Sequence, residues 1–217
     1  MKNLLYKELR LATPLLTVLF LGFAVMAFLP GYPILCGAFF MGLGTFQGYQ
    51  YQREAGDITY SLLLPVKKTH IVTAKYLAAV CLQLAAFLLF AAFTWIRMTF
   101  LSDAPVYEQN VMMGANPVFL GFVLIIFAGF NGLFLGGFFK TAYGLAKPFL
   151  AFGIFAFLTI AAAEALHHFP GMAWTNALDY SQMGRQSAVL LCGAVLYVAV
   201  TVLSCKLSQK RFEKLDL

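Results

Sequence analysis

The stretch that decides the fold is LATPLLTVLFLGFAVMAFLPGYPILCGAFFMGLGTFQGYQYQ, residues 11–52. None of its 42 residues is charged. A helix that crosses the roughly 30 Å hydrocarbon core of a membrane needs about 20 apolar residues, so the run is long enough for two crossings. The cluster Pro30-Gly31-Tyr32-Pro33 divides it, because proline and glycine end helices. Two membrane spans are predicted, at about 13–29 and 34–51.

The composition of the whole chain agrees with this prediction. Of its 217 residues, 61% are hydrophobic and 11% are charged, whereas a soluble domain carries about 25% charged residues. A sizeable soluble domain is therefore excluded. The net charge of +6 does not indicate nucleic-acid binding, because that function needs a polar surface to display the charge.

The same search for charge-free runs gives four further spans, at about 76–96, 117–139, 148–168 and 186–205. Residues 1–12 form a predicted amphipathic helix at the membrane interface, because Leu4, Leu5 and Leu9 recur with a helical period opposite Lys7 and Arg10. The predicted fold is therefore an all-α membrane protein with six transmembrane helices in a single transmembrane domain, residues 1–217.

The orientation follows from the basic residues, which concentrate on the cytoplasmic side of membrane proteins. Six spans place both termini on one side, and 13 of the 15 Lys and Arg residues share that side. They are Lys2, Lys7, Arg10, Arg53, Lys67, Lys68, Lys75, Lys140, Lys147, Lys206, Lys210, Arg211 and Lys214. Only Arg97 and Arg185 lie on the other side. We therefore expect a multi-pass protein of the cell membrane with cytoplasmic N- and C-termini, and contact with anionic lipid.

The loop at 53–75 does more than return the chain. It combines six charges with the apolar string YSLLLPV, residues 60–66. Glu54 and Asp57 are acidic residues of the kind that favour a helix N-terminus, and Pro65 is expected to end the helix that follows. A short amphipathic helix on the cytoplasmic face is predicted, either docked to a partner or lying on lipid headgroups.

Residues 53–77, REAGDITYSLLLPVKKTHIVTAKYL, resemble the loop after the second span in permease subunits of type 2 ABC transporters. The amphipathic N-terminus and the six-span layout agree with the same family. The positions that carry the resemblance are Glu54, Gly56, Leu64, Pro65, Val66, Lys67, Lys68 and Lys75. Lys67-Lys68 stands where many members have Ser-Arg.

The resemblance implies that the short helix is a coupling helix, which docks into a separate nucleotide-binding ATPase subunit. On this interpretation charge at Glu54 or Asp57 meets the ATPase, Gly56 permits close backbone approach, and Pro65 fixes the helix exit. It also implies a dimer with a second permease copy or a paralogue. The chain has no G-x-x-x-x-G-K-[ST] motif, and its nearest string, GGFFKT at 136–141, lacks the glycine before lysine. ATP and Mg are therefore expected in the partner chain, with no cofactor in this one.

Glu164 stands at the outer end of the fifth span. The apolar run 148–163 has only 16 residues, so a full crossing carries Glu164 and His167 into the outer membrane region. With His168 they could line an extracellular gate, or Glu164 could reach the headgroups from a short, tilted helix. A metal site that includes Asp179 is a weaker alternative, since no standard ligand spacing is present.

Two pairs of small residues indicate close helix packing: Gly44 with Gly48, and Gly132 with Gly136. Such pairs serve contacts within a chain or between subunits. Asn131, near the middle of the fourth span, is expected to bond to a neighbouring helix or to face the transport path.

The function predicted from the sequence is the permease subunit of an ATP-driven exporter for a hydrophobic or amphipathic substrate, such as a peptide, lipid or drug. The alternative is a non-transport membrane protein, either an intramembrane enzyme that uses Glu164 and the two histidines, or an immunity or sensor accessory protein.

Overall fold

A computed structural model describes residues 2–10, 12–102, 104–108 and 110–215. All regular elements in these ranges are helical. They are α1 (Lys2–Arg10), α2 (Leu15–Leu19), η1 (Phe20–Phe28), α3 (Cys36–Glu54), α4 (Asp57–Leu63), α5 (Lys68–Phe100), α6 (Pro105–Glu108), α7 (Pro117–Gly129), η2 (Phe130–Leu135), α8 (Gly136–Phe138), α9 (Ala146–Leu166), η3 (Ala173–Asn176), η4 (Tyr180–Gln182) and α10 (Met183–Glu213).

Four helical stretches are long and apolar enough to cross a membrane: Lys68–Phe100, Pro117–Phe138, Ala146–Leu166 and Tyr180–Glu213. They overlap the predicted spans three to six. The bounds agree within two residues for 117–139 and 148–168, whereas Lys68–Phe100 and Tyr180–Glu213 extend well beyond the predicted 76–96 and 186–205. The first two predicted spans are also helical, as α2 with η1 and as α3. The first qualifies by length and composition only together with α1, from which it is bent by 82°, and α3 is not among the stretches that qualify. The prediction of six spans therefore stays a prediction.

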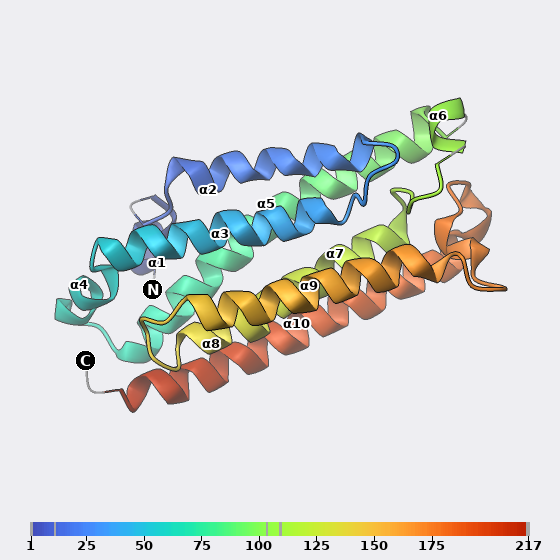
Figure 1. Ribbon diagram of the computed structural model, residues 1–217. Helices are drawn as coiled ribbons and strands as arrows, with labels where there is room; N and C mark the ends of the chain where they lie inside the picture. The colour runs from blue at the N-terminus through green and yellow to red at the C-terminus, as the bar shows by residue number, and fades with distance from the viewer. Residues whose placement is uncertain (1, 11, 103, 109, 216–217) are drawn as a thin grey trace.

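The long helices form an elongated bundle with α7 and η2 at its centre (Figure 1). In the most apolar window of this central stretch 78% of the residues are buried, against 17% for α10. Asn116 starts α7 by accepting a hydrogen bond from the Phe119 amide at 3.1 Å, and Pro117 follows at the first helical position. The expected start at Pro117 is therefore confirmed.

Helices α1, α4 and α8 and the C-terminal end of α10 gather at one end of the bundle, and α6 lies at the other (Figure 1). Arg97, near the end of α5, and Arg185, near the start of α10, are remote from the first end along their helices. The division of basic residues deduced from the sequence thus corresponds to the two ends of the bundle.

The helix predicted over residues 1–12 is found as α1, Lys2–Arg10. Residues 1 and 11 of the predicted range lie outside the described part of the chain, and residue 12 is not helical. The predicted faces of α1 are partly wrong. Leu4 and Glu8 are buried, the Lys7 side chain is only 11% exposed, and Leu9 is 38% exposed. Lys7 and Glu8 therefore face the protein interior, where α1 packs on α5, whereas Lys2 and Arg10 are exposed.

Candidate functional site

The end of the bundle that holds α1 and α4 contains a buried group of four charges, Lys7, Glu8, Asp57 and Lys75, which we call the four-charge cluster. Lys7 and Glu8 come from α1, Asp57 is the first residue of α4, and Lys75 lies in the second turn of α5. The side-chain exposures are 11%, 2%, 9% and 1% respectively. The cluster joins the N-terminal helix, the short helix and the third predicted span in one place.

Each ammonium group of the cluster has three acceptors for its three protons. Lys75 Nζ lies 3.0 Å from Glu8 Oε2, 2.6 Å from Asp57 Oδ2 and 2.6 Å from Gln52 Oε1. Lys7 Nζ lies 2.9 Å from Glu8 Oε1, 2.7 Å from Asp57 Oδ1 and 2.7 Å from Ser61 Oγ. Both carboxylates therefore bridge both lysines, and the formal charges sum to zero.

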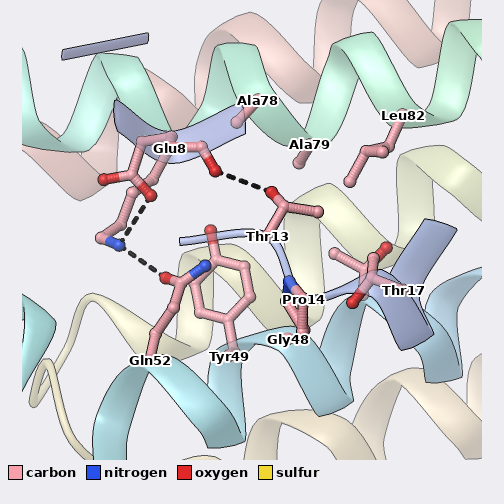
Figure 2. A pocket seen from close by; sticks show the side chains of 12 residues that line it. Glu8, Thr13, Pro14, Thr17, Gly48, Tyr49, Gln52, Ala78, Ala79 and Leu82 are labelled. Carbon is pink, nitrogen blue, oxygen red and sulfur yellow. Dashed lines mark hydrogen bonds and ion pairs between the residues drawn. The ribbon is translucent and has the colours of Figure 1, made fainter. Parts of the chain in front are cut away.

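Residues at the end of α3 and just after α1 surround the four-charge cluster and form hydrogen bonds beside it. Figure 2 shows the Glu8 carboxylate and the Gln52 amide pointing toward the same ammonium group, while Thr13 donates to the Glu8 carbonyl oxygen at 2.7 Å. The Gln52 Nε2 donates to the Ala12 carbonyl at 2.9 Å. The cavity on the Glu8 side of the cluster is about 20 Å³, which is room for about one water molecule. A second cavity of about 150 Å³ borders Asp57 and Lys75 on the other side, so water can approach the cluster from there.

The surroundings shift the pKa values of two members. Burial lowers the pKa of Lys7, but Glu8 and Asp57 outweigh burial and hold that pKa above its usual 10.5. Burial raises the pKa of Asp57, but Lys75 and Lys7 outweigh it and hold that pKa below its usual 3.8. Both groups are thus kept in their charged forms.

The predicted short helix is present as α4, and its bounds correct one expectation. Glu54 is the last residue of α3 and not part of the short helix, which begins at Asp57. Gly56 has φ of +65°, and a Cβ there would meet nothing within 4 Å. The glycine therefore provides a left-handed turn between α3 and α4, and the expected close approach of a partner's backbone at Gly56 stays a prediction.

The end of α4 agrees with the prediction. Leu64 is extended, with ψ of 148°, because the proline ring of Pro65 disfavours helical geometry at the residue before it. Lys67 then precedes α5 and is exposed.

The predicted placement of Asp57 at a partner surface is wrong, since both its carboxylate oxygens bind lysines inside the protein. Lys75, taken as part of the same motif, is its buried partner. The outer face of α4 is instead apolar: Tyr60 is 58% and Leu63 81% exposed. Glu54, Gly56 and Pro65 are exposed around it.

Sequence reasoning missed Lys7, Glu8, Gln52 and Ser61 as members of this site. One signal was available, because Glu8 is the only acidic residue among the first 53. An acidic residue in a helix that is expected to lie on lipid needs a cation nearby. Lys75 is a candidate, because it is a single charge directly before the apolar run that begins at residue 76.

Asn131 lies at the centre of a second buried site, which we call the polar network and which also includes Gln83, Tyr197 and Thr201. Asn131 Nδ2 donates to Gln83 Oε1 at 3.0 Å and to Thr201 Oγ1 at 2.8 Å, and Gln83 Nε2 donates back to Asn131 Oδ1 at 2.9 Å. Tyr197 adds a bond to Gln83 Oε1 at 2.8 Å. The expectation that Asn131 bonds to neighbouring helices is confirmed, and it does so from the π-helix η2.

Both glycine pairs serve contacts within the chain. A Cβ on Gly44 would lie 2.5 Å from Phe20 Cβ, and one on Gly48 would lie 2.9 Å from Thr17 Oγ1, so this pair admits α2 and η1. Thr17 uses the approach to donate to the Gly44 carbonyl at 2.9 Å.

Gly132 and Gly136 face α10 in the same way, with the added Cβ 3.0 Å from Val200 Cγ1 and 2.7 Å from Ser204 Oγ respectively. Sequence spacing alone had left the subunit interface open as an alternative for each pair.

At the other end of the bundle, Glu164 and His167 hold the chain before α7. Glu164 Oε2 accepts from the Met113 amide at 2.7 Å, and His167 Nε2 is hydrogen-bonded to the Val111 carbonyl at 2.9 Å. His168 is exposed, and its ring lies 4.0 Å from that of His167. Within the described residues no group of three or more His, Cys, Asp or Glu side chains is placed to hold a metal ion.

Long apolar helices, a buried charge cluster at one end and an exposed short helix beside it define a multi-pass membrane protein with a structured loop between α3 and α5. The family model described as ABC-2 family transporter protein matches residues 3–213, nearly the whole chain. The chain therefore belongs to the ABC-2 transporter family, as the resemblance of residues 53–77 had indicated. No curated protein and no solved structure matches it. The family assignment favours a membrane subunit of a transporter over an intramembrane enzyme.

Proposed function

We propose that the chain is the permease subunit of an ATP-driven exporter of hydrophobic or amphipathic compounds. It crosses the membrane six times with both termini in the cytoplasm, and it pairs with a second permease copy or a paralogue. A separate ATPase subunit binds ATP and Mg. Membership of the ABC-2 family supports this proposal, since membrane subunits of that family generally work with ABC ATPases.

The observation that carries the proposal is the two-sided character of α4. Its inner side is fixed by Asp57 and Ser61, both buried and bonded to Lys7. Its outer side exposes Tyr60 and Leu63 at the end of the bundle. Tyr60 and Leu63 lie one helical turn apart and form a continuous exposed apolar patch, which is typical of a protein-binding surface. We assign this face to the ATPase, with Glu54, Gly56, Pro65 and Lys67 around it.

The four-charge cluster connects α4 to α5 and α1, so it can transmit a movement of α4 to both helices. When ATP binding moves the ATPase, α4 moves with it, and Asp57 carries the displacement to Lys75 of α5 and to Lys7 of α1. Since α5 runs from Lys68 to Phe100 without a break, a displacement at its start reaches the outer end. The cluster is therefore a mechanical joint, and α4 is the coupling helix.

The test is co-purification of the tagged chain with an ABC ATPase from its own host, followed by ATPase and export measurements in proteoliposomes. Leu63→Arg should reduce the recovery of the ATPase at least tenfold, because it places a charge in an apolar contact. Leu207→Arg is the matched control, since Leu207 is a 50% exposed leucine near the same end but on α10. Recovery of no ABC ATPase with the wild-type chain, or equal recovery with both variants, would contradict the proposal.

We also assign Glu164, His167 and His168 to the outer gate. The bonds of Glu164 and His167 to residues 111–113 support this, because releasing them would free the connection between α6 and α7. Glu164→Gln should change substrate-stimulated ATP hydrolysis and export. If both stay at wild-type levels, the gate assignment is wrong.

A further inference from the structure

A cavity of about 700 Å³ opens where η2, α8 and the start of α9 meet, at the same end of the bundle as α4. Four of its lining residues are basic: Arg53 from α3, Lys140 and Lys147 from the connection between α8 and α9 with its first turn, and Arg211 from α10. None of its lining residues is acidic. We call it the basic cavity.

Among the residues that the structure describes, the cations of the basic cavity have no acidic partners. Every ion pair in the part of the chain that the structure describes belongs to the four-charge cluster. Arg53 lies over the Tyr143 ring at 5.4 Å, and Arg211 donates to the Gly136 carbonyl at 3.0 Å. Lys140 and Lys147 are exposed. Four like charges around one hollow repel each other, so an anion that enters relieves this repulsion.

The rest of the lining is apolar and comes from the membrane-spanning part of the protein. Gly132 and Leu133 belong to the π-helix η2, and Pro148 and Ala151 to α9. Short side chains on both helices create the space, and Leu133 is 39% exposed. The cavity therefore has a cationic part at the membrane surface and an apolar part between two apolar helices.

We propose that the basic cavity binds an anionic amphiphile, with a phosphate or carboxylate head among the four cations and an apolar tail between η2 and α9. The occupant comes from the membrane leaflet at this end of the bundle. This inference rests on the proposed export function, which it narrows: the substrate class is an amphipathic anion, and the basic cavity is where it is loaded. Its volume lies within the range of about 300–1,000 Å³ found for small-molecule sites.

The first experiment measures binding to the purified full-length chain. The probes are fluorescent phosphatidylglycerol and fluorescent phosphatidylcholine in nanodiscs of otherwise neutral lipid. The wild-type chain should prefer phosphatidylglycerol by at least tenfold. Lys140→Gln with Lys147→Gln should weaken that binding by about fivefold per lysine, the factor that corresponds to about 1 kcal/mol per basic residue near a membrane surface.

The matched control is Lys206→Gln with Lys210→Gln, which removes the same charge from exposed positions of α10 outside the basic cavity. It should leave binding unchanged. Ala151→Trp keeps all four cations and fills the apolar part, so it should weaken binding of the long-chain probe and spare a short-chain analogue.

Three results would overturn the proposal. The first is equal affinity for the two lipids, which is also expected if a second copy of the chain covers the cavity. The second is an equal loss of binding in the two lysine double variants. The third is full displacement of phosphatidylglycerol by an equal concentration of inorganic phosphate, which would indicate a site for a free anion and no role for the tail.

Loading is tested in the complex with the ATPase. An anionic amphiphile that binds should stimulate ATP hydrolysis, and the Lys140→Gln with Lys147→Gln variant should lose at least half of that stimulation. If the complex assembles but the amphiphile leaves hydrolysis unchanged, the substrate assignment fails while the permease function stands. If no complex assembles, the permease function itself fails.

Discussion

The replacement Asp57→Asn tests the four-charge cluster most directly. It keeps the size of the side chain and removes one negative charge, so Lys7 and Lys75 are left with Glu8 as their acidic partner in the cluster. The net charge of the buried cluster rises from zero to +1. Removing one partner from a buried ion pair typically costs about 3–5 kcal/mol, because an uncompensated charge remains away from water.

That cost falls on the contact that holds α1 and α4 against α5. A change of about 3–5 kcal/mol raises the equilibrium constant for local opening by roughly two to three and a half powers of ten. Amide hydrogen exchange reports such opening segment by segment. We expect exchange in α1 and α4 to accelerate by at least a hundredfold, with α9 unchanged as the internal reference.

A double variant separates charge balance from simple loss of contacts. Lys75→Met alone leaves a net charge of −1, whereas Asp57→Asn with Lys75→Met returns the cluster to neutrality. The double variant should therefore be less destabilised than the sum of the two single variants. Glu54→Gln is the matched control, since Glu54 is exposed and lies only three residues away.

The reasoning is refuted if Asp57→Asn changes exchange in α1 and α4 by less than about threefold. It is also refuted if the effects of the two single replacements simply add.

Three further predictions follow the same physical logic. The pKa of Asp57 is lowered from 3.8 and that of Lys7 is raised from 10.5, so the cluster stabilises the fold between these two pH values. The stabilisation is lost as pH falls through the lowered pKa of Asp57 and as pH rises through the raised pKa of Lys7. Amide exchange in α1, corrected for intrinsic rates, should therefore be constant between pH 3.8 and 10.5 and faster outside that range. Asn131→Leu leaves the Gln83 amide without its partner and should cost about 1–3 kcal/mol, seen as a melting temperature lowered by roughly 2–10 °C in detergent. Gly44→Ala should lower the free energy of unfolding by about 1–3 kcal/mol, because the added Cβ clashes with Phe20. Gly153→Ala is the control: a Cβ there meets nothing within 4 Å in mid-helix, so the change should be neutral or stabilising by about 0.4–1 kcal/mol. Equal melting temperatures for the two variants would contradict the packing role of Gly44.

The helices were predictable because each depends on local properties of the chain. The start at Pro117 follows from the Asn-Pro pair, and the end of α4 at Leu63 follows from Pro65. The division of α3 from α4 at Gly56 was misread, with Glu54 assigned to the wrong helix. Acidic residues on both sides of a glycine fit a helix start equally well, and only the left-handed φ of Gly56 shows where the chain turns.

The candidate site was less predictable. The motif around Asp57 and Lys75 was recognised, but Asp57 was assigned to the outside. The partners of Asp57 lie at Lys7 and Lys75, 50 and 18 residues away along the chain. Nothing in the local pattern of α4 distinguishes an acid that meets a partner protein from one that neutralises a buried lysine, because both occupy the first turn of an amphipathic helix.

The sequence by itself determined that the chain is a helical membrane protein and how its basic residues divide between two ends. The physical reason is that the solvation of apolar runs and the position of charges depend on composition and order along the chain. Only the tertiary structure decided which charges neutralise one another and which remain free. Lys7 and Lys75 are fully paired inside the four-charge cluster, whereas Arg53, Lys140, Lys147 and Arg211 surround an open cavity. Charges interact through space, so their partners are fixed by the packing of α1, α3, α4, α5 and α10 and cannot be inferred from their order in the sequence.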